Sequence, residues 1–288
     1  MSLFILFPVT GFQVFSGKPD PAEDKHPKPA FTSQVPKKEQ DFTPPEKTKP
    51  EPQTNPQRPQ IQTPRPKETP PESSPEEKPV KTAYLTFDDG PSSTVTPQIL
   101  KILAEYNIKA SFFVVGQMAE IYPEIVQNIK SEGHFIGNHT YSHNYSLIYE
   151  STDNFWADVK QWETALVESI LGEDFESKII RFPGGSFGES KSIFRDFVLE
   201  QGYHYIDWNA LNGDAEDHYI PGPRLVQKLK ETVYNKEIAV ILMHDTDAKA
   251  TTAEALPEII DHLQNEGYVF QTIDDFDFNN NRSYKMGA

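Results

Sequence analysis

Proline is spread so unevenly along this chain that only one part of it can form a packed core. Of the 25 prolines in the 288 residues, 17 lie between Lys18 and Val80. Proline has no backbone N–H, and the same stretch contains few aromatic or branched apolar side chains that a core would need. We therefore predict a disordered linker with polyproline II character over residues 18–80. The folded domain is expected to span residues 81–278, and residues 279–288 form a tail.

The first 17 residues differ from the linker because they are mostly apolar. The stretch from Ser2 to Ser16 is shorter than the roughly 20 residues of a transmembrane helix, and Pro8 and Gly11 interrupt it. We interpret residues 1–17 as the remnant of a signal or membrane anchor whose basic region is missing; a short apolar tail is the alternative. A long linker suits a folded head held away from a membrane, so we expect an exported, extracellular or cell-surface protein.

Charge divides the chain at the same place. Residues 18–80 contain 11 basic and 11 acidic side chains, whereas the residues from 81 onward contain 16 basic and 32 acidic ones. The whole net charge of −16 therefore belongs to the folded domain. Binding to nucleic acid or to anionic lipid headgroups requires basic patches, so the charge argues against such partners and favours a neutral or cationic one.

From residue 81 onward, short apolar runs alternate with segments of helical periodicity. The predicted strands are residues 82–87, 111–116, 135–138, 178–182, 203–208, 237–244 and 268–273. The predicted helices are one capped by Thr96 with Pro97 at its first position, and residues 123–131, 151–171, 189–201, 223–235 and 252–266. About seven βα units predict a parallel sheet covered by helices, and their number favours a barrel over an open sheet.

Residues whose side chains could take part in catalysis or binding lie at the carboxyl ends of five of these strands. They are Asp88, Asp89, His139, His143, Arg181, Asp207, Trp208, His244 and Asp245. Because the active sites of βα barrels lie at the carboxyl ends of the strands, we expect these side chains to converge on one site.

Two of the histidines have a spacing that suits a metal. His139 and His143 are four residues apart, so one helical turn would place both imidazoles on one side. With one carboxylate they would hold a divalent cation and leave positions open for water and substrate, which is typical of a catalytic site. The facial triad of iron oxygenases is an alternative, but HxxxH on alternating βα units argues against it. Of Asp88 and Asp89, one can bind the metal while the other acts as a base.

Five motifs in order carry a resemblance to a known family. TFDDGP, HTYSH, RFPGG, DWN and ILMHD are similar to the motifs of the polysaccharide deacetylase family, also called NodB-homology or carbohydrate esterase family 4, over about residues 80–275. The resemblance implies a distorted (β/α) barrel of about seven units. It also implies a divalent metal, Zn²⁺ with Co²⁺ able to substitute, and hydrolysis of the N-acetyl group of an amino sugar.

The resemblance assigns roles motif by motif. The metal ligands would be Asp89, His139 and His143, and the general base would be Asp88. Arg181 would orient the base.

In the later motifs, His244 would be the acid that protonates the leaving nitrogen. Leu242 would line the pocket for the acetyl methyl group, and Trp208 would form a wall of the groove. Pro183 and Gly184 would contact the substrate.

The chain departs from the family pattern at two places. Many members have an aromatic residue after the proline of the third motif, whose N–H joins the oxyanion site; here it is Gly184, which keeps the N–H and loses the ring. The fourth motif is loose, so the carboxylate that partners Arg181 would be Asp207 or Asp214, with Asp214 slightly favoured.

Export, the linker and the acidic head favour the N-acetylglucosamine of Gram-positive peptidoglycan as the substrate. Chitin oligomers, secondary wall polysaccharides and the O-acetyl groups of xylan remain alternatives, because O- and N-deacetylases share these motifs. A non-catalytic wall-binding module is a further alternative, although binding alone needs neither Asp88 nor His244. We expect a monomer, with the N-terminus as a potential membrane anchor.

Overall fold

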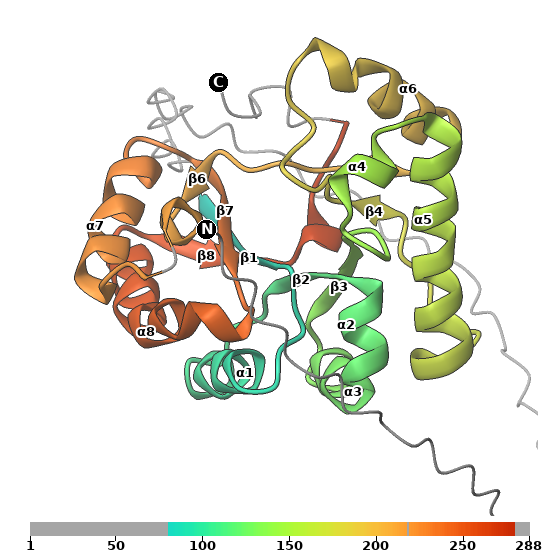
Figure 1. The fold of residues 1–288 in the computed structure, drawn as a ribbon. Coiled ribbons are helices and arrows are strands. Elements are labelled where there is room, and N and C mark those ends of the chain that lie inside the picture. Colours follow the sequence, from blue (N-terminus) through green and yellow to red (C-terminus); the bar gives the residue numbers. More distant parts are fainter. Residues whose placement is uncertain (1–79, 218, 280–288) are drawn as a thin grey trace, which may run out of the picture. The chain divides into compact units, whose positions relative to one another are not determined.

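Parallel strands form the centre of the described part of the chain (Figure 1). The structure, a computed structural model, describes residues 80–217 and 219–279. The strands are β1 (Lys81–Asp88), β2 (Ser111–Val114), β3 (Phe135–Asn138), β4 (Ile179–Ile180), β5 (His204–Tyr205), β6 (Ala210–Leu211), β7 (Ile238–His244) and β8 (Tyr268–Phe270). Every pairing among them is parallel, which confirms the predicted α/β class.

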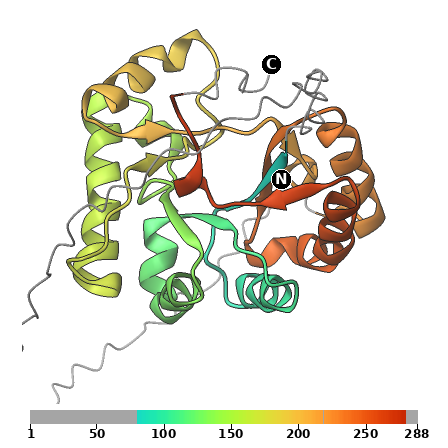
Figure 2. The same ribbon diagram turned by 180° about the vertical axis from the view of Figure 1, so that it is seen from behind.

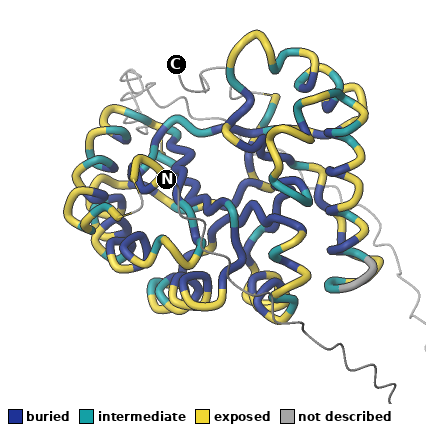
Figure 3. Tube along the Cα trace, viewed as in Figure 1, coloured by how far each residue is buried: buried dark blue, intermediate teal, exposed yellow. Residues whose placement is uncertain are grey.

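Helices surround this sheet, and Figure 2 shows the same arrangement from behind. They are α1 (Val95–Glu105), α2 (Gly116–Ile121), α3 (Pro123–Ser131), α4 (Tyr145–Ile148), α5 (Thr152–Leu166), α6 (Ser192–Glu200), α7 (Gly222–Val233) and α8 (Ala250–Asn265). The longer helices bury apolar residues three and four positions apart, such as Ile99 and Leu103 in α1 and Leu256, Ile259 and Ile260 in α8. The buried residues accordingly gather at the centre, and the exposed ones lie on the outer faces of the helices (Figure 3).

One extended segment joins the two ends of the sheet. The strand order is β5-β4-β3-β2-β1-β7-β6, and β8 pairs with the start of β1. Strands β5 and β6 lie at opposite ends of this order, yet only residues 206–209 separate them along the chain. The N–H groups of Ile206 and Asn209 donate to carbonyls of β4 and β7 at 3.0 and 3.1 Å. Residues 204–212 thus bridge β4 and β7, and the sheet forms the distorted barrel that the sequence predicts.

The alternation of side chains along β1 explains how an acid comes to face the barrel interior. Leu85 and Phe87 belong to the outer core, against the helices, whereas Tyr84 belongs to the inner core. Because side chains alternate along a strand, Thr86 and Asp88 point to the same side as Tyr84. Strand β7 repeats this pattern in register with β1, and Asp88 is the partner of its last residue, His244.

Several boundaries differ from the prediction. Residues 203–208, expected to be one strand, contribute only β5, and helices α2 and α4 were not expected. The predicted cap at Thr96 is wrong: α1 begins at Val95, and the buried Thr96 hydroxyl donates to Asp245 Oδ2 at 2.7 Å instead.

Part of the predicted domain plan cannot be compared. The N-terminal segment, the linker up to residue 79 and residues 280–288 of the tail lie outside the described residues. Within residues 80–217 and 219–279, no helix has the length and apolar character needed to cross a membrane.

Candidate active site

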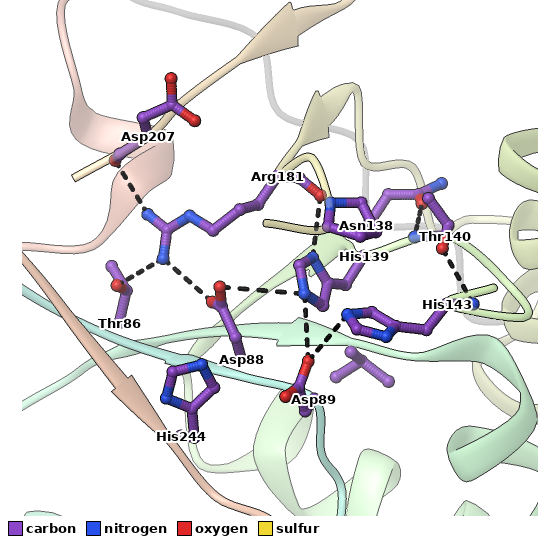
Figure 4. Close-up of polar contacts among 12 residues, drawn as sticks. Thr86, Asp88, Asp89, Asn138, His139, Thr140, His143, Arg181, Asp207 and His244 are labelled. Carbon is purple, nitrogen blue, oxygen red and sulfur yellow. Dashed lines mark hydrogen bonds and ion pairs between the residues drawn. The ribbon is translucent and has the colours of Figure 1, made fainter. Parts of the chain in front are cut away.

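The two adjacent acids face the same site because the chain turns at the second of them. Successive side chains of a strand point to opposite faces, so a regular strand would separate Asp88 from Asp89. Asp89 has a φ of +74°, in the left-handed region that non-glycine residues adopt rarely. This conformation brings its carboxylate next to His139 and His143, while Asp88 stays inside the barrel (Figure 4).

The two histidines are held by a loop whose backbone groups are bonded to buried side chains. The Asn138 side chain accepts from the Thr140 N–H at 2.8 Å, and the Thr140 hydroxyl accepts from the His143 N–H at 3.2 Å. Asp158, on α5, accepts from the N–H groups of residues 141 and 142 at 2.7 and 2.9 Å. The loop is therefore held in shape before any ligand binds.

The loop directs both imidazoles at one oxygen. Oδ1 of Asp89 lies 3.2 Å from Nε2 of His139 and 3.1 Å from Nε2 of His143. Nδ1 of His139 lies 2.8 Å from the Arg181 carbonyl, and because a carbonyl only accepts, Nδ1 carries the proton. In the neutral ring, Nε2 is then a lone-pair acceptor facing a carboxylate oxygen. Such a contact is favourable only if a proton or a cation lies between the two atoms.

These groups fit a divalent metal. One ligand atom from each of Asp89, His139 and His143 lies within 4.8 Å of the other two. Two imidazole nitrogens and one carboxylate are a set that Zn²⁺ accepts, and three protein ligands leave room for water or substrate. Burial raises the pKa of Asp89, but the hydrogen bonds of His139 and His143 outweigh it and lower the pKa well below its usual value. Asp89 therefore carries a negative charge at neutral pH, which suits the binding of a cation.

Arg181 is completely buried and holds Asp88 in place. Its Nη1 donates to Asp88 Oδ1 at 3.0 Å and to the Thr86 hydroxyl at 2.6 Å. Its other nitrogens, Nε and Nη2, donate to the carbonyls of Ile206 and Asp207 at 3.1 and 3.2 Å. A buried guanidinium bonded to this many acceptors fixes the position of the carboxylate beside it.

The expectation that Asp214 pairs with Arg181 is wrong. Asp214 Oδ1 lies 2.7 Å from Nδ1 of His244, and its Oδ2 accepts from the His244 N–H and the Thr252 hydroxyl at 2.8 Å each. The physical reason is topological: Asp214 follows β6, which pairs with β7, whereas Arg181 follows β4 on the other side of β1. The alternative, Asp207, offers Arg181 its backbone carbonyl, while its carboxylate accepts from the Ser186 N–H and hydroxyl at 2.8 and 2.6 Å.

The Asp214 carboxylate sets the protonation of His244. Burial alone lowers the pKa of this imidazole, but the hydrogen bond and the charge of Asp214 outweigh burial and raise the pKa to about 9. The proton at Nδ1 is shared with Asp214, so Nε2 is the nitrogen left for substrate. Within the described residues it has no hydrogen-bond partner.

A second buried acid lies behind the turn at Asp89. Burial, together with the charges of Asp88 and Asp89, raises the pKa of Asp245 to about 7. A Cβ added to Gly90 would lie only 2.2 Å from Asp245 Oδ2, so this close approach requires glycine. Asp245 thus packs directly against the turn that presents Asp89.

The residues expected to contact substrate lie around the same end of the barrel. Leu242 is buried inside it, two residues before His244, and Trp208 is half-buried next to Phe187, with ring centroids 5.2 Å apart. Pro183 is buried, and the next residue, Gly184, is exposed with a φ of +70°.

Comparison with known proteins gives a consistent result. The family model for polysaccharide deacetylases matches residues 76–206. A peptidoglycan-N-acetylglucosamine deacetylase of Bacillus cereus is 30% identical over 194 residues, covering 66% of this chain and 68% of that protein. A second protein of that name and organism is 32% identical over 197 residues, covering 67% of this chain and 86% of that protein. The solved structure of a Streptococcus mutans CE4 esterase matches with a TM-score of 0.62 and 33% identity, covering 67% of this chain and 85% of that one.

The chain belongs to the polysaccharide deacetylase family. It is a hydrolase that removes acetyl groups from a polysaccharide. The resemblance drawn from the five motifs is thus confirmed, and so is the fold that it implies.

Two side chains beside the deacetylase site were not expected from the sequence. Asp158 lies on the apolar stripe of α5, between Phe155 and Trp162, and an acid at a core position is a signal that could have been read. Tyr145 is the first residue of α4 and lies against His143, with ring centroids 5.3 Å apart. Its spacing from His143 carries no such signal, because α4 itself was not predicted.

Proposed function

We propose that this deacetylase removes N-acetyl groups from the N-acetylglucosamine residues of peptidoglycan. Two relatives that carry the name of this activity are 30% and 32% identical to the chain. The observation that carries the chemistry is the pairing of Asp88 with His244, register partners on adjacent strands beside the Asp89, His139 and His143 group. A base and an acid thereby reach the same bond.

Asp89, His139 and His143 would hold the divalent metal, with Zn²⁺ favoured and Co²⁺ able to substitute. Bound there, the cation would polarise the acetyl carbonyl and lower the pKa of the attacking water. Asp88 is the general base that accepts a proton from this water as it attacks the carbonyl carbon. Arg181 orients Asp88, because its Nη1 donates to the oxygen Oδ1 and leaves Oδ2 for the water.

The remaining groups stabilise the tetrahedral intermediate and assist its breakdown. The Gly184 N–H, which donates to no acceptor among the described residues, donates to the developing oxyanion; such a donor is typically worth about 3 kcal/mol. His244 transfers the proton at Nε2 to the leaving nitrogen, the C–N bond breaks, and acetate and a free amine leave. Asp214 stabilises the charged imidazole before the transfer. Leu242 contacts the acetyl methyl group, and Trp208 forms a wall for the sugar.

The proposed setting is the surface of a Gram-positive bacterium. The proposal combines the wall substrate of the relatives with the proline-rich composition of residues 18–80, which suits a spacer between the N-terminus and the folded domain. The acidic domain suits a neutral glycan that becomes cationic as acetyl groups leave. We propose that the enzyme acts as a monomer, with residues 1–17 as the potential membrane anchor.

Mass spectrometry of muropeptides tests the substrate. Walls from cells expressing the wild-type protein should contain muropeptides that lack an acetyl group on glucosamine, and walls from cells expressing Asp88→Asn should not. Unchanged muropeptides, together with deacetylation of chitin oligomers or acetylated xylan by the same protein, would move the assignment to those polymers.

A further inference from the structure

An exposed tyrosine stands between the histidine loop and the turn at Gly184. Tyr145 is 48% exposed, although its ring meets that of His143 edge to face at 5.3 Å between centroids. It also meets the ring of Tyr149, with 6.0 Å between centroids. An aromatic side chain in contact with two neighbouring rings, yet exposed by about half, leaves part of its surface open for a ligand at the site.

The hydroxyl end of this ring lies over Gly184. A Cβ added to Gly184 would be 2.9 Å from Tyr145 Cε1 and 3.0 Å from the Tyr145 hydroxyl oxygen. Any larger residue at position 184 would therefore displace the ring. The glycine and the tyrosine are complementary: the missing side chain of one makes room for the aromatic ring of the other.

The hydrogen bonds around the turn leave two donors unused. The Pro183 carbonyl accepts from the Tyr149 hydroxyl at 2.8 Å and from Lys191 Nζ at 3.0 Å, and the Gly185 carbonyl accepts from Lys191 Nζ at 2.6 Å. By contrast, neither the Gly184 N–H nor the Tyr145 hydroxyl has a partner within the described residues. Two neighbouring donors without acceptors, at the edge of a site for a neutral sugar, point to the hydroxyl and carbonyl oxygens of that sugar as their acceptors.

We infer that Tyr145 is a substrate-positioning residue of this deacetylase: its ring packs against the pyranose whose acetamide enters the site, and its hydroxyl donates a hydrogen bond to that sugar. The inference rests on the proposed function and adds a residue to it. The ligand class is a neutral acetamido-hexopyranose within a chain. Trp208 and Phe187 lie over the neighbouring Gly185, so aromatic rings flank both glycines of the turn.

Steady-state kinetics on N-acetylglucosamine oligomers test the inference with two variants. Tyr145→Phe removes only the hydroxyl, and because one neutral hydrogen bond is lost, KM should rise about three- to tenfold while kcat changes less than about twofold. Tyr145→Ala removes the ring as well and should raise KM further. The matched control is Tyr234→Phe, which alters a tyrosine 75% exposed just beyond α7 and should match the wild type. Bound metal per chain is measured for each protein and should not change.

The outcomes separate this inference from the proposed function. Wild-type activity with unchanged KM in both Tyr145 variants would overturn the inference and leave the proposed function standing. Loss of metal from Tyr145→Phe would also overturn it, because the residue would then serve His143 and not the sugar. A wild-type protein with bound metal that deacetylates neither N-acetylglucosamine oligomers nor peptidoglycan glycan strands would overturn the proposed function and this inference together.

Discussion

Two carboxylate–imidazole groups face the same end of the barrel, and they differ in which ring nitrogen meets the carboxylate. In the first, Asp89 faces Nε2 of His139, whose Nδ1 is tied to a backbone carbonyl. In the second, Asp214 faces Nδ1 of His244 and leaves Nε2 free within the described residues. The same two residue types thus produce different chemistry. Nitrogen and oxygen acceptors that converge suit a cation, whereas an imidazole backed by a carboxylate suits a proton donor.

Removing a ring from the first group should have the largest effect. His139→Ala deletes one of the three proposed metal ligands, so bound metal and turnover should both fall to background. Chelation of the wild-type protein should do the same, and added Zn²⁺ or Co²⁺ should restore the wild type but not the variant. Metal analysis and turnover measure this, with the exposed His204→Ala as the control that should keep both. A metal-free His139→Ala protein with full activity would contradict the assignment of His139 as a metal ligand.

The next largest effect is expected from mutating the adjacent acids, whose variants should differ in metal content. Asp88→Asn should keep the metal and lose about two to four orders of magnitude in kcat, the usual worth of a positioned base. Asp89→Asn should lose metal as well as activity, because an amide is a poorer ligand than a carboxylate. Metal stoichiometry and kcat of both variants decide the matter. Equal metal loss in the two, or a near wild-type rate for Asp88→Asn, would show that the proposed division of labour is wrong.

A mutation in the second group, formed by Asp214 and His244, should have a smaller effect, which appears in the pH dependence of kcat. The pKa of His244 is raised to about 9, so its acid form exists below that value and is lost as pH rises through it. Asp214→Asn removes the charge that outweighs burial, so the alkaline limb of kcat should move down by about one unit or more. A bound cation lowers the pKa of His244 in both proteins, so the shift between them is the quantity to measure. A variant whose limb stays in place, with metal content equal to wild type, would contradict the role of Asp214.

The candidate site was predictable where strand periodicity decides it. Asp88 and His244 end two apolar runs, and the alternation of side chains together with the rule of carboxyl strand ends predicts that they meet. The partner of Asp214 could not be predicted in this way. It depends on β6 lying beside β7, and chain order does not reveal this pairing, because β5 and β6 are neighbours in sequence and far apart in the sheet order.

The local conformations at the turn after β1 and at the start of α1 also could not be predicted from the sequence. At the paired acids the left-handed residue is Asp89 itself, and the next residue must be glycine because Asp245 packs against Gly90. Threonine is a common helix N-cap, but the hydroxyl of Thr96 donates to the buried carboxylate of Asp245 instead. In both cases a contact between residues more than 140 positions apart overrides a local preference.

Arg181 links the proposed metal site to the proposed base. Its backbone carbonyl sets the orientation of His139, while its guanidinium sets that of Asp88. A displacement of this one residue would therefore disturb the positions of both side chains at once. For protein engineering, this means that a new metal preference cannot be introduced at His139 by shifting β4 without also shifting the base. The two should be redesigned as a single rigid unit that includes Arg181.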